Sequence, residues 1–231
     1  MHIGILQTGL APDVLAPAFG DYPDMFQRLL DGNGFTYRTY CVVKGEMPAR
    51  ATDCDGWLIT GSRHGVYEDH PWIAPLEALI RDAFAAHVPV VGICFGHQIV
   101  AQAMGGRVEK YAGGWAVGAT GYDFGDETMT LNAWHQDQVV SLPPGAKVIA
   151  HNDFCANAAL LYDDHALTIQ AHPEFGPDFI DSLIQTRGRG VVPDPILASA
   201  LERLETPLHD HAIATRIATF FKAPRAGGPN P

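Results

Sequence analysis

The sequence is poor in basic residues, and this scarcity argues against several kinds of partner. Its 231 residues include only 15 Lys and Arg against 26 Asp and Glu, for a formal net charge of −11 at pH 7. Binding to nucleic acid or to an anionic membrane depends on clustered Lys and Arg, which release counterions from phosphates. We therefore expect no nucleic-acid partner and no membrane partner.

Long apolar runs and paired cysteines are missing as well. No apolar stretch reaches the ~20 residues that cross a bilayer, and the N-terminal segment lacks the basic and long apolar regions of a signal peptide. A cytoplasmic location is expected. Cys41, Cys54, Cys94 and Cys155 form no C-x-x-C pair and no zinc-ribbon spacing. Because thiols stay free in a reducing compartment, we interpret each as a single thiol.

Short apolar runs alternate with segments of helical period, which is typical of a mainly parallel open sheet with helices on both faces. We expect residues 1–222 to form one such α/β domain and residues 223–231, rich in Pro and Gly, to form a flexible tail. Strands are predicted at 1–6, 35–43, 57–60, 88–93, 115–124, 129–134, 147–150, 159–162 and 166–171. Helices are predicted between Pro23 and a Gly32–Gly34 stop and at 71–87, 96–104, 177–186, 195–204 and 210–222.

The segment Gly92–Gly96 reads Gly-Ile-Cys-Phe-Gly and joins a predicted strand to a predicted helix. This is the G-x-nucleophile-x-G pattern of a nucleophile elbow. The glycines permit a sharp turn, and the helix N-terminus favours the thiolate form of Cys94 over the thiol. Backbone N–H groups of the turn, including that of Phe95, would face a developing oxyanion. A buried structural cysteine is the alternative, and the elbow alone leaves both interpretations open.

A thiolate nucleophile needs a base, and the base needs an orienting group. His172 directly follows a predicted strand, which Pro173 ends. Residues two apart in an extended chain project to the same side, so the Glu174 carboxylate can reach the His172 imidazole. His97 is nearer to Cys94 in sequence, but neighbouring positions of a helix face different directions. We therefore prefer His172 as the base.

Other polar segments are assigned no chemistry. His209-Asp210-His211 offers two imidazoles beside a helix N-terminus, which more often serve as a polar cap than as metal ligands. The basic segment 187–190 is interpreted as a solvated turn. We expect no metal and no cofactor.

Two segments taken together, 91–98 (Val-Gly-Ile-Cys-Phe-Gly-His-Gln) and 171–175 (Ala-His-Pro-Glu-Phe), resemble the class I glutamine amidotransferase family. In that family a Cys-His-Glu triad hydrolyses glutamine to glutamate and ammonia. Two further segments occur in the family's order: 60–67 resembles its oxyanion loop, and 135–139 resembles the loop that helps to hold the substrate. The resemblance covers roughly residues 1–186 and implies a single-domain, flavodoxin-like α/β fold.

The resemblance also implies a role for individual residues. Cys94 would be the nucleophile that forms a thioester, His172 the general base and acid, and Glu174 the orienting carboxylate. Gly61 and Phe95 would supply the N–H groups that bind the oxyanion. The substrate would be glutamine or another small γ-glutamyl compound.

Substrate contacts are expected from Gln98, His135, Trp134 and Tyr67, the last two as an aromatic wall able to pack a leaving group bulkier than ammonia. Two positions depart from the family's pattern. Ser62 stands where many members have proline, and Trp134 stands where many have a small polar residue.

Residues 61–73 resemble stand-alone members of the family, including those related to γ-glutamyl peptidases. About 45 residues follow position 186, fewer than the ~50 of an ordinary domain, so any synthetase that accepts ammonia would act in trans. The alternatives are a γ-glutamyl peptide hydrolase proper, a non-catalytic glutamine-sensing subunit of a synthetase, and a cysteine-elbow hydrolase with another substrate.

Overall fold

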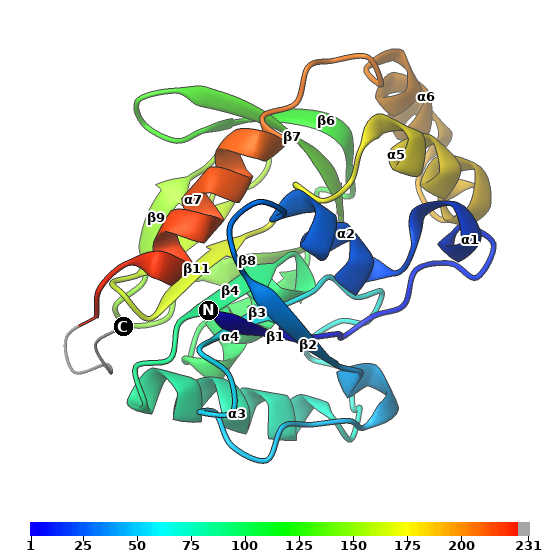
Figure 1. Cartoon of the computed structure of the whole chain (residues 1–231). Coiled ribbons are helices and arrows are strands. Elements are labelled where there is room, and N and C mark those ends of the chain that lie inside the picture. The colour runs from blue at the N-terminus through cyan, green and yellow to red at the C-terminus, as the bar shows by residue number, and fades with distance from the viewer. Residues whose placement is uncertain (226–231) are drawn as a thin grey trace.

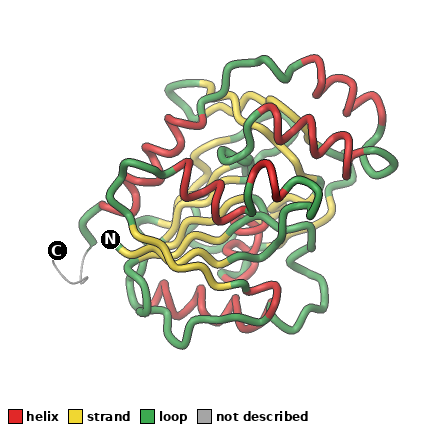
Figure 2. The backbone as a smooth tube through the Cα atoms, turned by 45° about the vertical axis from the view of Figure 1, so that its right-hand side comes forward, coloured by secondary structure: helices red, strands yellow, loops and turns green. Residues whose placement is uncertain are grey.

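The computed structural model describes residues 1–225, and a seven-stranded sheet lies at its centre (Figures 1 and 2). Its strands are β1 (His2–Leu6), β2 (Thr36–Tyr40), β3 (Gly56–Ile59), β4 (Val90–Ile93), β9 (Lys147–Ala150), β10 (Ala159–Tyr162) and β11 (Ala166–Ile169). They are arranged in the order β2-β1-β3-β4-β11-β10-β9, and β10 alone runs in the direction opposite to the other six strands. The predicted α/β class with a mainly parallel open sheet is confirmed.

Helices cover both faces of this sheet (Figure 1). They are α1 (Ala16–Phe19), α2 (Tyr22–Leu29), α3 (Ile73–Ala85), α4 (Phe95–Ala103), α5 (Pro177–Leu183), α6 (Asp194–Glu202) and α7 (Asp210–Lys222). Every residue of β3 and β4 is buried, as expected of parallel strands covered on both sides. On one face Trp57 packs in a core with Leu76 of α3 and Val100 of α4. On the other, Leu58 shares a core with Phe26 of α2.

Two small sheets extend the central one. The predicted strands 115–124 and 129–134 form the hairpin β6 (Ala116–Asp123) and β7 (Thr128–His135). The pair β5 (Arg107–Lys110) and β8 (Asp137–Ser141) was not predicted. β5 buries only Val108, so its sequence carries no apolar alternation. β8 also corrects the interpretation of 135–139 as a loop, because His135 ends β7 and Asp137 begins β8.

Most predicted helices are present, and two segments need correction. The strand predicted at 35–43 ends at Tyr40, and Val42–Lys44 forms a 3₁₀ turn instead, with the N–H of Val43 donating to the carbonyl of Gln7. The helix predicted at 177–186 divides into α5 and a π-helical segment, η2 (Ile184–Gly188). The short helix α1 was not predicted.

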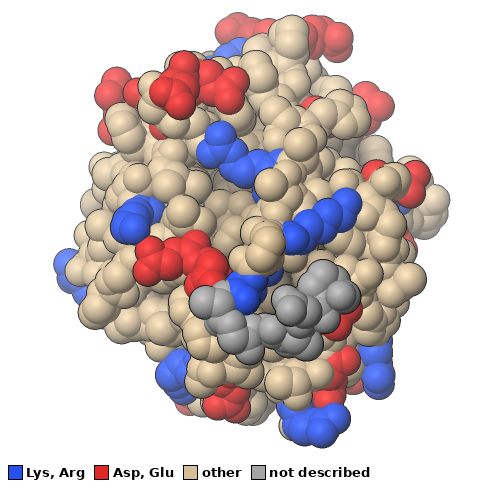
Figure 3. Space-filling model, turned by 60° about the vertical axis from the view of Figure 1, so that its left-hand side comes forward, with Lys and Arg blue, Asp and Glu red and all other residues tan. Residues whose placement is uncertain are grey.

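Helix α7 ends at Lys222, where the tail was predicted to begin. The Arg225 guanidinium donates to the carbonyls of Asp164 at 3.0 Å and Phe220 at 2.7 Å. The rest of the expected tail, residues 226–231, lies outside the described residues. All four cysteines are free thiols. Within residues 1–225, no helix is both long and apolar enough to cross a membrane. On the face shown in Figure 3, basic side chains lie in separate groups among acidic ones.

Candidate active site

Cys94 lies at the sharp turn between β4 and α4. Its backbone adopts φ 54° and ψ −102°, a conformation that few residues other than glycine adopt. A Cβ on Gly92 would lie 2.4 Å from the carbonyl oxygen of Gly96, and a Cβ on Gly96 would lie 2.3 Å from that of Ile59. Both glycines are therefore required for the turn, and the strand, turn and helix that a nucleophile elbow needs are all present.

His172 lies three residues beyond Ile169, the last residue of β11, and pairs with Glu174. Its Nδ1 donates to Oε1 of Glu174 at 2.7 Å, and the side chains are 5% and 1% exposed. The ring of Phe175 stacks on the imidazole, with centroids 4.1 Å apart and an interplanar angle of 4°. These contacts fix the ring plane of His172, whose side chain lines the same cavity as Cys94.

Asn132 of β7 holds this segment from the neighbouring hairpin, and sequence reasoning missed it. Its carbonyl accepts the backbone N–H of His172 at 2.8 Å, and its side-chain amide donates to the carbonyl of Phe175 at 2.8 Å. Nothing in the local sequence distinguishes this asparagine from one at a turn, because both partners come from a distant segment.

The electrostatics of the pair favour a protonated imidazole. Burial disfavours the charged ring, but the Glu174 carboxylate and then Cys94 outweigh it and raise the pKa of His172 to about 10. A positive charge next to the sulfur of Cys94 is the environment that activates cysteine nucleophiles. The arrangement can therefore support an imidazolium that donates a proton to a leaving group.

Three adjacent strand ends bring the site together. β4 lies between β3 and β11 and runs parallel to both, so Gly61, Cys94 and His172 all follow strands at one edge of the sheet. A Cβ on Gly61 would lie 2.8 Å from Cε1 of His172 and 3.8 Å from Cβ of Cys94. The hydroxyl of Thr8 donates to the carbonyl of Gly61 at 3.2 Å. Phe95 is the first residue of α4, so its backbone N–H is one of the donors that have no hydrogen-bond partner within the helix.

A cavity of about 440 Å³ opens over Cys94 and His172, and all four expected substrate-contact residues, Gln98, Trp134, His135 and Tyr67, line it. The side-chain nitrogen of Gln98 is already occupied, since it donates to the carbonyl of Asp137 at 3.0 Å and to Oε1 of Gln170 at 3.1 Å. A substrate contact from Gln98 would therefore use its side-chain oxygen.

His135 is buried against the same cavity in its neutral form. Burial and the nearby His172 lower its pKa to about 4. Its Nδ1 lies 3.2 Å from the carbonyl oxygen of Asp137, and its Nε2 has no hydrogen-bond partner among residues 1–225. The hydroxyl of Tyr67 donates to Oδ2 of Asp137 at 2.9 Å. Asp137 thus contacts three of the expected contact residues, Gln98, His135 and Tyr67.

Several cavity residues escaped sequence reasoning. Arg187 was interpreted as part of a solvated turn, but it lies in the π-helical segment η2 and lines the cavity. Tyr22, from the N-terminus of α2, and Trp115, just before β6, also line it. Each comes from a segment without any catalytic motif, so only the packing of distant elements could reveal them.

The histidines set aside in the sequence have other partners. Nδ1 of His97 lies 2.8 Å from the hydroxyl of Thr168, and complete burial lowers the pKa of His97 to about 3, so it is a neutral core residue. Nδ1 of His209 accepts the N–H of Thr130 at 3.0 Å, and its side chain does not cap α7.

Comparisons with known proteins point to one family. The family model described as glutamine amidotransferase class-I matches residues 35–184. A glutamine amidotransferase-like protein of Schizosaccharomyces pombe is 31% identical over 95% of this chain and 98% of its own length. Gamma-glutamyl peptidase 4 of Arabidopsis thaliana is 32% identical over 72% of each chain. Among solved structures, a glutamine amidotransferase of Methylobacillus flagellatus has a TM-score of 0.75 and 26% identity, covering 96% of this chain and 91% of its own.

Proposed function

We propose that this chain, which belongs to the class I glutamine amidotransferase family, hydrolyses the γ-amide bond of glutamine or of a γ-glutamyl compound. The reaction would pass through a thioester on Cys94. One observation carries the proposal: the His172 imidazole, hydrogen-bonded to Glu174, lines the same cavity as Cys94 at neighbouring strand ends. This order of nucleophile, base and orienting carboxylate is the arrangement that thiol hydrolases require.

In the first half of the reaction the Cys94 thiolate attacks the γ-carbonyl carbon, and the carbonyl oxygen becomes an oxyanion. The backbone N–H groups of Gly61 and Phe95 stabilise that charge. The His172 imidazolium donates its proton to the leaving nitrogen as the C–N bond breaks. The amine departs, a thioester remains on Cys94, and His172 is left neutral.

In the second half water replaces the amine. Neutral His172 accepts a proton from the water as the water attacks the thioester carbon, and the same two N–H groups stabilise the second oxyanion. Collapse of this intermediate breaks the C–S bond and releases the γ-carboxyl product. His172 is protonated again beside the Cys94 thiolate, so the starting state is restored.

The cavity supports a substrate larger than glutamine. Its volume of about 440 Å³ lies within the ~300–1,000 Å³ typical of small-molecule sites. Trp115 and Trp134 offer apolar surface to a leaving group, and Arg63, Lys110 and Arg187 offer positive charge to a carboxylate. A γ-glutamyl compound whose leaving amine carries apolar atoms and a carboxylate would use both features. A stand-alone γ-glutamyl hydrolase therefore fits this cavity better than an enzyme restricted to releasing ammonia.

The four free thiols and a reaction that depends on a reduced Cys94 suit a reducing compartment such as the cytoplasm. Because water is the only second substrate of the proposed hydrolysis, the reaction needs no cofactor. A synthetase that takes up ammonia would be a partner only if glutamine were the substrate.

A substrate screen tests the proposal. The purified chain and its Cys94→Ala variant would be incubated with glutamine, γ-glutamyl dipeptides and glutathione, and glutamate and ammonia would both be quantified. We expect glutamate from at least one γ-glutamyl peptide, without matching ammonia, and none with Cys94→Ala. If the chain alone turns over no substrate but releases ammonia from glutamine when a synthetase from the same cell is added, it is instead a trans-acting subunit. Glutamine binding without turnover would indicate a sensing subunit.

A further inference from the structure

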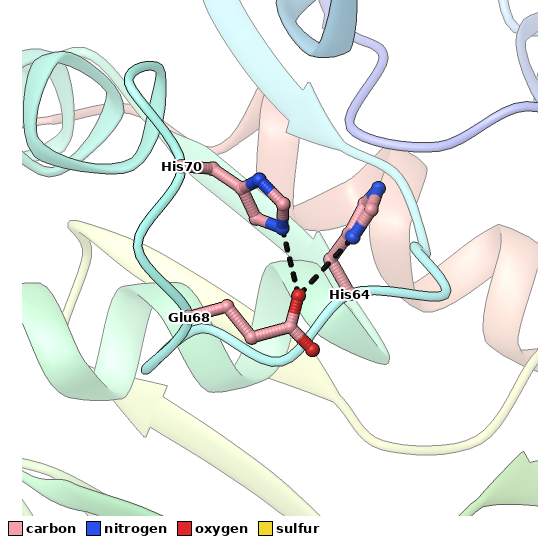
Figure 4. A group of neighbouring side chains, drawn as sticks. All are labelled: His64, Glu68 and His70. Atoms are coloured by element: carbon pink, nitrogen blue, oxygen red, sulfur yellow. Dashed lines mark hydrogen bonds and ion pairs between the residues drawn. The ribbon is translucent and has the colours of Figure 1, made fainter.

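Three side chains of the loop between β3 and α3 converge beside the catalytic cavity: His64, Glu68 and His70 (Figure 4). Nδ1 of His64 lies 3.2 Å from Oε2 of Glu68, and Nε2 of His70 lies 2.7 Å from the same oxygen. The three atoms all lie within 4.8 Å of one another. Two imidazole nitrogens thus face a single carboxylate oxygen, a disposition that the catalytic reaction does not use.

The spacing of these atoms is close to that of a metal ligand set. Zinc lies about 2.0–2.2 Å from imidazole nitrogens and carboxylate oxygens, so tetrahedral ligands stand about 3.3 Å apart. The separations from Glu68, 3.2 Å for His64 and 2.7 Å for His70, are shorter than this value by about 0.1 Å and about 0.6 Å. Small side-chain rotations would therefore admit the ion.

Neighbouring contacts orient the three side chains in advance. The imidazole of His70 stacks on the indole of Trp72, with centroids 5.6 Å apart and an interplanar angle of 7°. The His64 ring meets the His70 ring edge to face at 4.2 Å. Ligands held in place in this way lose little freedom on binding.

We propose that His64, Glu68 and His70 bind one divalent transition-metal cation of the zinc type. Two imidazoles and a carboxylate suit zinc, cobalt or nickel better than magnesium or calcium, which prefer all-oxygen ligands. The His64, Glu68 and His70 side chains are 20%, 43% and 30% exposed, so the ion can reach the site and keep water in its remaining positions. The cation would bind the ring nitrogens that face Glu68, and each neutral imidazole would then carry its hydrogen on the other nitrogen.

The site adjoins the expected oxyanion donors. Trp72, on which His70 stacks, also packs against Phe95 with centroids 5.5 Å apart. The N–H of His64 donates to the hydroxyl of Ser62, the residue after Gly61, at 3.2 Å. His64 and Glu68 themselves line the cavity that contains Cys94. A bound cation would therefore cross-link the loop that carries one oxyanion donor, and the ring of Trp72 would connect His70 to Phe95, which carries the other.

The test must separate this site from Cys94 and His172, which also offer zinc ligands. We would use the full chain carrying Cys94→Ala, titrate it with ZnCl₂ in a calorimeter, and record the absorption spectrum with CoCl₂. We expect one ion per chain and a cobalt spectrum without a sulfur-to-metal charge-transfer band. Adding His70→Ala or Glu68→Gln should weaken zinc binding about 100-fold or more.

A matched control comes from a second group of two histidines and a carboxylate, His87, Asp164 and His165. His165→Ala should leave zinc binding unchanged. Glu68→Gln preserves the size of the side chain, so a fold intact by circular dichroism makes any loss of binding specific to the site. The proposal is overturned if zinc binds no more tightly to the parent chain than to Glu68→Gln, or if His165→Ala abolishes binding. Neither outcome bears on the hydrolysis proposed above, because the measurement does not involve turnover.

Discussion

The backbone of Gly61 packs so closely against the imidazole of His172 that a Cβ on residue 61 would lie 2.8 Å from Cε1 of the ring. The contact joins the loop after β3 to the segment after β11, across the strand end that carries Cys94. Because the Gly61 backbone has a negative or extended φ outside the left-handed region, the crowding of His172, and not backbone strain, makes glycine necessary here.

Gly61→Ala should therefore displace His172 or the loop and lower kcat about 100-fold, since a misplacement of about 1 Å can cost that much. The measurement is steady-state kinetics on the best γ-glutamyl substrate. Gly121→Ala is the matched control, because its nearest contact would be Cγ2 of Thr128 at an ordinary 3.4 Å. Unchanged kcat in Gly61→Ala would refute the argument from crowding.

Cys94 should be the only thiol labelled by a glutamine-like electrophile, as read by mass spectrometry of the intact chain and its peptides. Burial raises the pKa of Cys155 to about 12 and also raises the pKa of Cys54 and Cys41, so these thiols are poor nucleophiles at neutral pH.

Cys94→Ala should abolish labelling and turnover, whereas Cys41→Ala, Cys54→Ala and Cys155→Ala should retain both. If Cys94→Ala is still labelled at a defined second cysteine, that cysteine and not Cys94 is the nucleophile.

Replacement of Glu174 should shift the alkaline limb of the pH profile. His172 has a pKa raised to about 10, so the imidazolium that protonates the leaving amine is present below that pH and is lost as the pH rises through it. In Glu174→Gln the carboxylate that favours the charged ring is gone and burial lowers the pKa of His172.

The kcat/KM profile of Glu174→Gln, measured from about pH 6 to pH 11, should thus fall at a lower pH than that of the parent chain. Glu174→Asp keeps the charge and should restore most of the alkaline limb. An unshifted limb in Glu174→Gln would show that another group supplies the proton. We expect His172→Ala to lose more activity than either variant, because an orienting residue usually contributes less than the base.

Trp134→Ser should shift the preference towards plain glutamine. Trp134 lines the cavity, and removing its ring takes away apolar surface that a bulky leaving group would bury. Burial of a large apolar side chain contributes about 1.5–3 kcal/mol, so the ratio of kcat/KM for an apolar γ-glutamyl dipeptide over glutamine should fall roughly tenfold or more.

Phe124→Ser is the control for this change, because Phe124 lies just beyond β6 at the opposite end of the same hairpin and is not among the cavity residues. An unaltered ratio in Trp134→Ser would place the leaving group against another wall, such as that of Trp115.

The sequence was informative where the structure is local. A strand, a turn and a helix around Cys94 follow from apolar runs and two glycines within a few residues, and the hydrogen bond between His172 and Glu174 follows from their spacing along an extended segment. Such contacts join residues close in the chain, so short-range geometry predicts them. Prediction from the sequence failed where the conformation of a segment depends on distant partners. Examples are the strand pair β5 and β8 and the π-helical segment that carries Arg187.

By itself, then, the sequence determined the fold class, the turn at Cys94 and the pairing of His172 with Glu174. Only the tertiary structure decided that β3, β4 and β11 are neighbours, which brings Gly61, Cys94 and His172 to one edge of the sheet. It also decided that His64 and His70 face one oxygen of Glu68, although all three residues lie in a single polar loop. The physical reason is the same in both cases. Strand order and loop conformation are set by burial and hydrogen bonds summed over the whole core. The sequence around each of these residues therefore does not indicate which distant residue it will contact.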